Sequence, residues 1–351
     1  MKKIKILRQL LAFLLTFIML FMSVDINVFA QSTQSEGKYI VTFKDQSAKE
    51  KYVKDKTKGK KVKKNFEKQS SVAVELTDTD IAELSADPDV LYVESDSAVE
   101  ILSTGKPDKN DNAVKNMKNG EQTTPWGVTA IGATSTMNKY DGKNIKVAIF
   151  DTGVAPHEDL TISGGVSFVD YTTSYTDDNG HGSHVAGIIS ANNNKLGVVG
   201  IAPNAEIYAV KILNQNGGGN YSNIISALEW AIDNNINIIN MSLGGNDDNR
   251  ALHEAIKEAV NAGIIIVAAA GNRGVGEDTI TYPARYPEVV SVGAVDQNYN
   301  IASFSSRGPE LDIVAPGKSI LSTINDICHN VRHINGCTLC DRRISSVGEQ
   351  E

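Results

Sequence analysis

Three short stretches of the sequence carry side chains that could support acid–base and acyl-transfer chemistry. Asp151 directly follows the apolar run Ile145–Phe150, His181 opens a stretch rich in glycine and alanine, and Asn272 follows Ala268-Ala269-Ala270-Gly271. An imidazole with a carboxylate nearby is an effective general base. A side-chain amide at the end of a strand can donate a hydrogen bond to a developing oxyanion.

Each of these residues, taken alone, also has a purely structural interpretation. Asp151 could cap a turn, His181 could be a structural residue at a helix start, and Asn272 could occupy a turn after glycine. The residues that follow His181 favour the catalytic interpretation. Gly182 permits a close approach of the backbone, and Ala186 and Gly187 have almost no side chain, so a helix could pack tightly under the site.

The elements that must position these residues follow from the apolar pattern after Gln122. Continuous apolar strands are predicted at residues 145–150, 207–213, 236–239, 264–270 and 289–295. Two amphipathic helices lie between them, with apolar faces formed by Ile224, Ile225, Leu228, Ala231 and Ile232, and by Leu252, Ile256, Ala259 and Val260 before Gly263. This alternation predicts an α/β fold in which helices cover both faces of a parallel sheet. The active site of such a fold lies beyond the carboxyl ends of its strands.

A smaller module precedes this domain. Strands are predicted at residues 38–43, 71–76 and 90–94, a helix-compatible stretch at 46–57, and a helix opened by an acidic cap at 78–86. The order is that of a small α+β module that ends near Ile101. The polar stretch Ser103–Gly120 is predicted to be a linker.

The N-terminus has the organisation of a signal peptide. Basic residues precede an apolar run from Leu10 to Val24, and Val28-Phe29-Ala30 has small residues two positions apart. We expect cleavage after Ala30 and export to the extracellular medium, with an uncleaved anchor as the alternative. The three cysteines all lie in the last stretch of the chain, so the exported body has no disulfide framework.

The net charge of the chain limits which classes of partner it can bind. A net charge of −8 and a pI near 5.4 argue against nucleic acid as the main partner, because phosphate binding needs a dominant basic surface. Basic residues cluster between Lys49 and Lys68, as a solvated face or as a binding patch.

The ordered set of motifs resembles the subtilisin-like serine protease family, the subtilases. Beyond the three stretches above, the resemblance includes Trp126-Gly127-Val128, Asn240-Met241-Ser242-Leu243-Gly244, Tyr282-Pro283-Ala284, Ser303-Phe304-Ser305-Ser306 and Ala315-Pro316-Gly317. It implies an Asp-His-Ser triad in which Asp151 orients His181 and His181 takes a proton from a serine hydroxyl. It further implies that Asn272 donates to the oxyanion and that Ser242, Leu243 and Gly244 pair with the substrate backbone. The preceding module resembles the family's inhibitory, ferredoxin-like propeptide.

The same resemblance suggests a calcium site. Its ligands would be Gln122, Asp159, Asn192, Asn194, Leu196 and Val198, which offer side-chain and carbonyl oxygens to a hard cation. A polar loop without a metal is the alternative. Ser183 stands where the family usually has threonine.

The resemblance ends at about Asn325. A Gly-Thr-Ser-Met-Ala segment with the nucleophile is expected there, but the chain continues as Asp326-Ile327-Cys328-His329-Asn330. We interpret this as a truncated or frame-disrupted gene and expect an inactive chain. Cys328, His333, Cys337 and Cys340 could alternatively bind zinc, although an exported thiol cluster would tend to oxidise.

The sequence therefore predicts five segments: a signal peptide (1–30), an inhibitory propeptide (31–101), a linker (102–121), a partial catalytic domain (122–325) and an out-of-family tail (326–351). The predicted protein is a secreted, monomeric serine endopeptidase precursor that acts on proteins or peptides and carries its own inhibitor. We expect neither nucleic-acid binding nor a stable membrane anchor. The alternative is a non-catalytic protein whose propeptide or half-domain binds subtilases or peptides.

Overall fold

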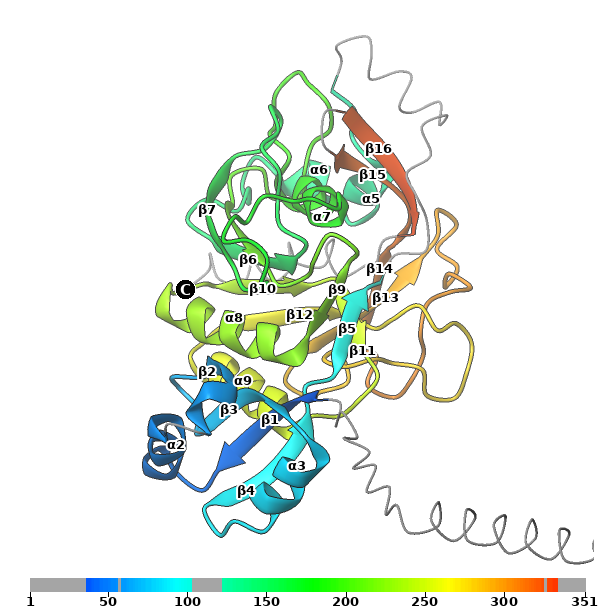
Figure 1. Ribbon diagram of the computed structural model, residues 1–351. Coiled ribbons are helices and arrows are strands. Elements are labelled where there is room, and N and C mark those ends of the chain that lie inside the picture. The colour runs from blue at the N-terminus through cyan, green and yellow to red at the C-terminus, as the bar shows by residue number, and fades with distance from the viewer. Residues whose placement is uncertain (1–35, 56–57, 103–121, 325–326, 334–351) are drawn as a thin grey trace, which may run out of the picture. The chain divides into compact units, whose positions relative to one another are not determined.

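The computed structural model describes residues 36–55, 58–102, 122–324 and 327–333 (Figure 1). The expected signal peptide, residues 103–121 of the expected linker, and Cys337 and Cys340 of the proposed zinc cluster lie outside the described residues. Of Cys328, His329 and His333 only the backbone is described. None of the helices in the described ranges combines the length and the apolar character that a bilayer crossing requires.

The N-terminal module is a four-stranded antiparallel sheet with two helices. Its elements are β1 (Gly37–Phe43), α2 (Gln46–Lys54), the 3₁₀ turn η1 (Gly59–Lys61), β2 (Val62–Asn65), β3 (Ser71–Leu76), α3 (Asp78–Ser85) and β4 (Val90–Ser95), and the strand order is β2-β3-β1-β4. This confirms the predicted α+β propeptide fold. The acidic cap predicted for α3 was wrong, because Thr77 caps the helix and Asp80 closes a capping box with it.

The large domain is built on a seven-stranded parallel sheet, as predicted. In the order of the sheet its strands are β14 (Ile313–Pro316), β13 (Val290–Val295), β12 (Ile265–Ala269), β10 (Ile238–Met241), β6 (Lys146–Asp151), β8 (Glu206–Lys211) and β7 (Ile162–Ser167). The sequence analysis missed the two edge strands. β7 contains Gly164 and Gly165, and β14 has two exposed residues, so neither presents the continuous buried run of a central strand.

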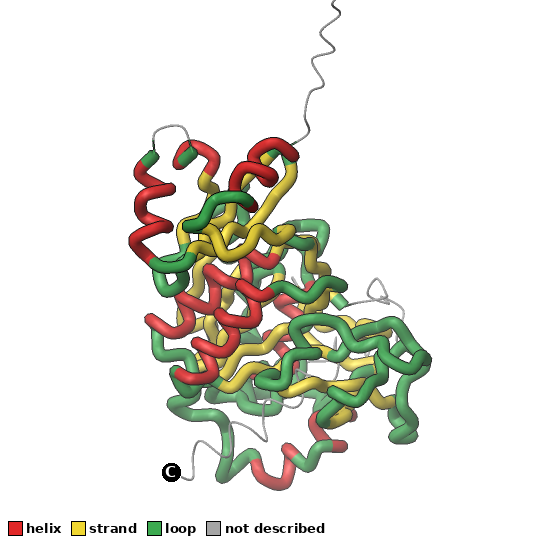
Figure 2. Tube along the Cα trace, turned by 90° about the horizontal axis from the view of Figure 1, so that it is seen from below, coloured by secondary structure: helices red, strands yellow, loops and turns green. Residues whose placement is uncertain are grey.

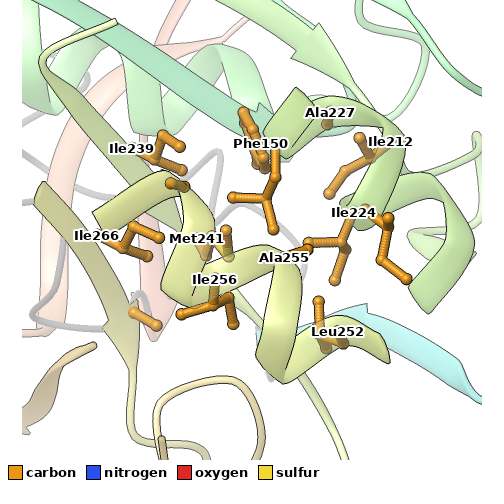
Figure 3. Packing of buried hydrophobic residues seen from close by; sticks show 14 of the residues in the cluster. Phe150, Ile212, Ile224, Ala227, Ile239, Met241, Leu252, Ala255, Ile256 and Ile266 are labelled. Atoms are coloured by element: carbon orange, nitrogen blue, oxygen red, sulfur yellow. The ribbon is translucent and has the colours of Figure 1, made fainter. Parts of the chain in front are cut away.

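Helices cover both faces of this sheet. Successive residues of a strand point to opposite sides, so each face has its own buried cluster. Ala148 and Phe150 of β6 pack with α8 (Tyr221–Asp233) and α9 (Arg250–Asn261) in one buried cluster (Figure 3). Val147 and Ile149 pack in a second cluster with α7 (His181–Ser190), α5 (Trp126–Ala130) and α6 (Ala133–Thr136). Figure 2 shows helices, in red, beside the strands, in yellow.

A hairpin of β15 (Lys318–Ile324) and β16 (Ile327–His333) lies against α7 (Figure 1). Ser322 Oγ donates to the carbonyl of His184 at 2.6 Å, and Thr323 Oγ1 donates to the carbonyl of Ser183 at 2.9 Å. A Cβ at Gly187 would lie 2.2 Å from Thr323 Oγ1 and 2.9 Å from its backbone nitrogen. The missing side chain of Gly187 is therefore what allows this contact, as the sequence analysis expected for the helix that begins at His181.

A third, three-stranded sheet joins the two parts of the chain. It consists of β11 (Leu243–Gly245), β5 (Ala98–Ile101) and β9 (Gly218–Asn220), with β5 antiparallel to both neighbours (Figure 1). The sequence analysis did not predict β5 as a strand.

We predict that Gly187→Ala destabilises the folded chain, because the added Cβ overlaps the backbone of β15. Overpacking of this kind costs about 1–3 kcal/mol, so the melting temperature should fall by several degrees. Thermal unfolding followed by circular dichroism measures this.

Gly218→Ala is the matched control, since its Cβ would meet only the Asn214 side chain, at 3.7 Å. Equal melting temperatures for Gly187→Ala and the unmodified chain would contradict the described packing of α7 on β15.

Candidate active site

Asp151 and His181 form a buried hydrogen-bonded pair. Asp151 is the last residue of β6 and is fully buried, and His181 is the first residue of α7. His181 Nδ1 lies 2.8 Å from both carboxylate oxygens of Asp151. In the neutral imidazole this contact places the proton on Nδ1, so that Nε2 is the basic atom.

The electrostatics of the pair favour a protonated imidazole. Burial by itself lowers the pKa of His181, but the charge of Asp151, the hydrogen bond to it and the charge of Asp177 outweigh burial and raise that pKa above 6.5. Nε2 is buried and has no hydrogen-bond partner among the described residues. A basic nitrogen held in one orientation is what a general base requires.

Two glycines bring the end of β6 and the start of α7 together. A Cβ at Gly182 would lie 2.0 Å from the carbonyl oxygen of Gly153. Gly153 has a φ of 104°, a left-handed conformation that side chains other than glycine rarely adopt. The close backbone approach expected at Gly182 is therefore present.

Asn272 lies beyond the carboxyl end of β12, on the same edge of the sheet as Asp151. Strands β12, β10 and β6 are neighbours, so Asn272, Ser242 and Asp151 follow three adjacent parallel strands. Gly271 has a φ of 124°, and a Cβ there would lie 2.7 Å from Ser306 Oγ. The amide of Asn272 donates to the carbonyl oxygen of Leu102 at 2.9 Å.

The residues predicted to bind the substrate backbone bind strand β5 instead. Leu243 pairs with Ile101, and Gly244 pairs with Glu100. The chain continues in this register, because the nitrogen of Leu102 donates to the carbonyl of Ser242 at 3.2 Å. An extended segment of the chain thus occupies the edge at which a peptide substrate was expected.

The six residues predicted to bind calcium also come together. Gln122 Nε2 lies 2.7 Å from the carbonyl oxygen of Asn192, 3.3 Å from Asn194 Oδ1, and 3.1 Å from the carbonyl oxygens of Leu196 and Val198. A side-chain amide has only two N–H groups, so it cannot satisfy four acceptors. Four oxygens that converge on one atom form the kind of cage that a hard cation occupies.

The side chain of Asp159 is bonded to two of these residues. Its carboxylate accepts from Asn194 Nδ2 at 2.9 Å and from the nitrogen of Val198 at 3.0 Å, and burial raises its pKa to about 6. The described residues contain no group of three or more His, Cys, Asp or Glu side chains that could hold a metal. The residues predicted to bind calcium offer carbonyl and amide oxygens and one carboxylate, that of Asp159.

Sequence reasoning missed three residues around the pair. Leu102 was assigned to the linker, yet it lies beside Asn272. Thr152 and Asp177 were assigned no role, yet both bond to the backbone at the start of α7. The run Asp177-Asp178-Asn179-Gly180 directly before His181 was the available signal, because Asp and Asn favour helix caps and turns.

Comparison with known proteins places these observations in a family. Residues 142–339 match the model of the subtilase family, and residues 38–102 match that of the peptidase inhibitor I9. The chain is 43% identical to Subtilisin E of Bacillus subtilis (strain 168) over 325 residues, which are 90% of this chain and 80% of that protein. It is 41% identical to Minor extracellular protease Epr of the same organism over 294 residues, 82% of this chain and 44% of that protein.

We predict that Asp151→Asn changes how stability depends on pH. A raised His181 pKa means that this pair stabilises the folded chain below pH 6.5 and that the contribution is lost as the pH rises through the raised pKa. The difference in melting temperature between the unmodified chain and Asp151→Asn should therefore be larger at pH 5.5 than at pH 9. Differential scanning calorimetry across this range measures it.

Asp170→Asn is the control, since it removes an exposed carboxylate and should give a difference that does not depend on pH in this way. If the Asp151→Asn difference is equally flat, Asp151 does not determine the protonation of His181.

Proposed function

The chain belongs to the subtilase family, and we propose on that premise that Asp151, His181 and Asn272 are its catalytic residues. By family it is a subtilisin-like serine endopeptidase with an intramolecular propeptide inhibitor. The observation that carries the residue assignment is the hydrogen bond from Asn272 to the carbonyl of Leu102. That contact puts a specific peptide carbonyl beside the side-chain amide predicted to bind an oxyanion.

The proposed reaction assigns one task to each residue. Asp151 holds the Nδ1 proton, so His181 Nε2 is free to take the proton from a serine hydroxyl. The serine oxygen then attacks the carbonyl carbon of Leu102, and Asn272 donates to the oxygen as it becomes negative. His181 returns the proton to the nitrogen of Ser103, the Leu102–Ser103 bond breaks, and water later releases the acyl group.

We propose that the chain with the sequence printed here does not complete this reaction. The sequence after Asn325 contains no Gly-Thr-Ser-Met-Ala segment, and neither does any earlier stretch. An unprocessed chain keeps its propeptide covalently attached.

The propeptide makes directed polar contacts with the catalytic domain, which suit its inhibitory role. Asp96 accepts from the nitrogen of Ser222 at 2.8 Å and from its hydroxyl at 2.7 Å, at the N-terminus of α8. Glu94 accepts from the nitrogen of Arg250 at 3.1 Å, at the N-terminus of α9. Both carboxylates lie where helix dipoles favour negative charge, so they fix the position from which β5 reaches Leu243.

We also propose that Gln122, Asp159, Asn192, Asn194, Leu196 and Val198 hold a calcium ion. The convergence of their oxygens supports this proposal, and rotation of the Gln122 amide would present Oε1 to the same cage. The ion would supply positive charge that ties the segment at Gln122 to the loop that follows α7. A metal that binds only the folded chain stabilises it by mass action.

Export, a monomeric state and the five segment boundaries of the sequence analysis remain proposals. The sequence pattern of residues 1–30 supports export, and the printed name of the Epr relative describes that protein as extracellular. A role as a non-catalytic inhibitor of other subtilases is the second candidate function. It is favoured by the propeptide contacts and by the absent nucleophile segment.

We predict that the printed chain neither hydrolyses casein nor reacts with a fluorophosphonate probe. A chain supplied with a Gly-Thr-Ser-Met-Ala segment and its following helix after Asn325 should do both. N-terminal sequencing of that chain should find a new terminus at Ser103, because Leu102 is the residue whose carbonyl meets Asn272.

His181→Ala should block this processing, whereas His253→Ala, which removes a histidine bonded to Glu288, should not. Probe labelling of the printed chain would show that it has a nucleophile after all. A terminus other than Ser103 would exclude the proposed register of β5.

Calcium should raise the melting temperature of the chain. At a calcium concentration one hundred times the dissociation constant, the stabilisation is on the order of 2.7 kcal/mol. Asn194→Ala should weaken the response, because Asn194 Oδ1 is one of the four converging oxygens. Titration of the melting temperature with calcium and with a chelator measures both effects.

Asn193→Ala is the matched control in the same loop, since the Asn193 side chain contacts Met137 instead of the cage. A melting temperature that calcium leaves unchanged would exclude the site. Equal responses of Asn193→Ala and Asn194→Ala would remove Asn194 from it.

A further inference from the structure

Asp177 is a buried carboxylate that the proposed chemistry does not use. It lies in the loop between β7 and α7, and only 4% of it is exposed. Burying a carboxylate is costly unless hydrogen bonds satisfy its oxygens. The contacts that satisfy Asp177 therefore indicate what the residue does.

One oxygen of Asp177 holds the loop that leads into α7. Its Oδ1 accepts from the backbone nitrogens of Asn179 and Gly180, each at 2.9 Å. Its Oδ2 accepts from the nitrogen of Ser183 at 2.9 Å and from its hydroxyl at 2.7 Å. These contacts bracket His181 on both sides along the chain.

Asp177 also reaches the strand that carries Asp151. Thr152 Oγ1 donates to Asp177 Oδ1 at 2.8 Å, and the same hydroxyl accepts from the nitrogen of Gly182 at 3.0 Å. The nitrogen of Thr152 donates to Asp151 Oδ1 at 2.7 Å. The residue after Asp151 is thus bonded to the residue after His181, and Asp177 fixes the hydroxyl that joins them.

We infer that Asp177 is a positioning residue that sets the geometry of the Asp151–His181 pair through Thr152. The inference rests on the proposed function, in which that pair is the general base. Asp177 is then a second carboxylate that acts on the imidazole, although it touches neither the imidazole nor the substrate carbonyl. An acidic cap that merely stabilised α7 would have no need of the bond to Thr152, the residue directly after β6.

The charged groups around His181 fit this role. Asp151 on β6 and Asp177 are the two carboxylates whose charges act on the His181 pKa, and both raise it. Lys211 on β8 is bonded to Asp178 and to the carbonyls of Thr152 and Leu213, so its charge is already paired. Helix α7 itself also carries His184, and β15, which packs against it, begins with Lys318.

The test is the titration of His181 in the full chain, followed by NMR of histidines labelled with ¹³C at Cε1. His181→Gln assigns the resonance. Asp177→Asn should lower the pKa of His181 by roughly 0.5–1 pH unit, since it removes one carboxylate and two or more acceptor contacts. Thr152→Val should lower it too, because it cuts the link while every charge remains, and Thr152→Ser should restore the unmodified value.

Asp296→Asn is the matched control, because Asp296 also caps a turn, by accepting from the nitrogen of Asn298, but does so at the end of β13. It should leave the His181 titration unchanged. A folded Asp177→Asn chain with an unchanged His181 pKa would overturn the inference, even if its melting temperature fell. If Asp177→Asn does not fold, an unchanged pKa in Thr152→Val overturns it equally.

Asp151→Asn separates this inference from the proposed function. If Asp151→Asn leaves the His181 titration unchanged, the pair itself is refuted. If Asp151→Asn lowers the pKa while Asp177→Asn and Thr152→Val do not, the pair stands and only the positioning role of Asp177 fails.

Discussion

The contact between the end of β6 and the start of α7 is the constraint on which the candidate site depends. Gly182 and the carbonyl of Gly153 are so close that a Cβ at Gly182 would lie 2.0 Å from that oxygen. At this separation the carboxylate of Asp151 reaches the imidazole of His181. A wider gap would leave the buried Asp151 with only the local bond from the nitrogen of Thr152, and burial makes the loss of a partner costly.

Helix α7 also packs against strand β15. Gly187, one and a half turns after Gly182, contacts β15, whose two hydroxyls bond to carbonyls of α7. Two glycines of α7 thus allow close approaches to two segments of the chain, Gly182 to the residues at the end of β6 and Gly187 to β15. Since helix interiors disfavour glycine by up to about 1 kcal/mol relative to alanine, tertiary packing has to outweigh the local preference at both positions.

The propeptide supplies structure that the large domain does not complete alone. β11 is only three residues long; it pairs along its length with β5, and its last residue, Gly245, also forms a bridge with Tyr282. Val99 of β5 is buried in the cluster that also contains Tyr221 and Leu243. Strand β5 thus fills the edge of β11, and the carbonyl of the next residue, Leu102, accepts from Asn272.

Much of the fold could be predicted from the sequence because its periodicities are local. The five apolar strands, α8, α9 and three strands of the N-terminal module, β1, β3 and β4, show the periodic pattern of buried residues, whereas β2 was not predicted. β5 and β7 could not be found in this way. β5 alternates exposed and buried residues over only four positions, and its partners lie more than 100 residues away in the chain.

At the site, Asp151, His181 and Asn272 could be predicted from the sequence. The chemical group of each residue belongs to its own side chain, and the three lie in an ordered set of motifs. The sequence also predicted, through the same resemblance, the set of oxygens that converge near Gln122. Only the tertiary structure decided that Leu102 meets Asn272 and that Thr152 joins Asp177 to Gly182. These contacts depend on strand register and on the spacing of β6 from α7, which are set by packing between distant segments and leave no periodic trace in the sequence.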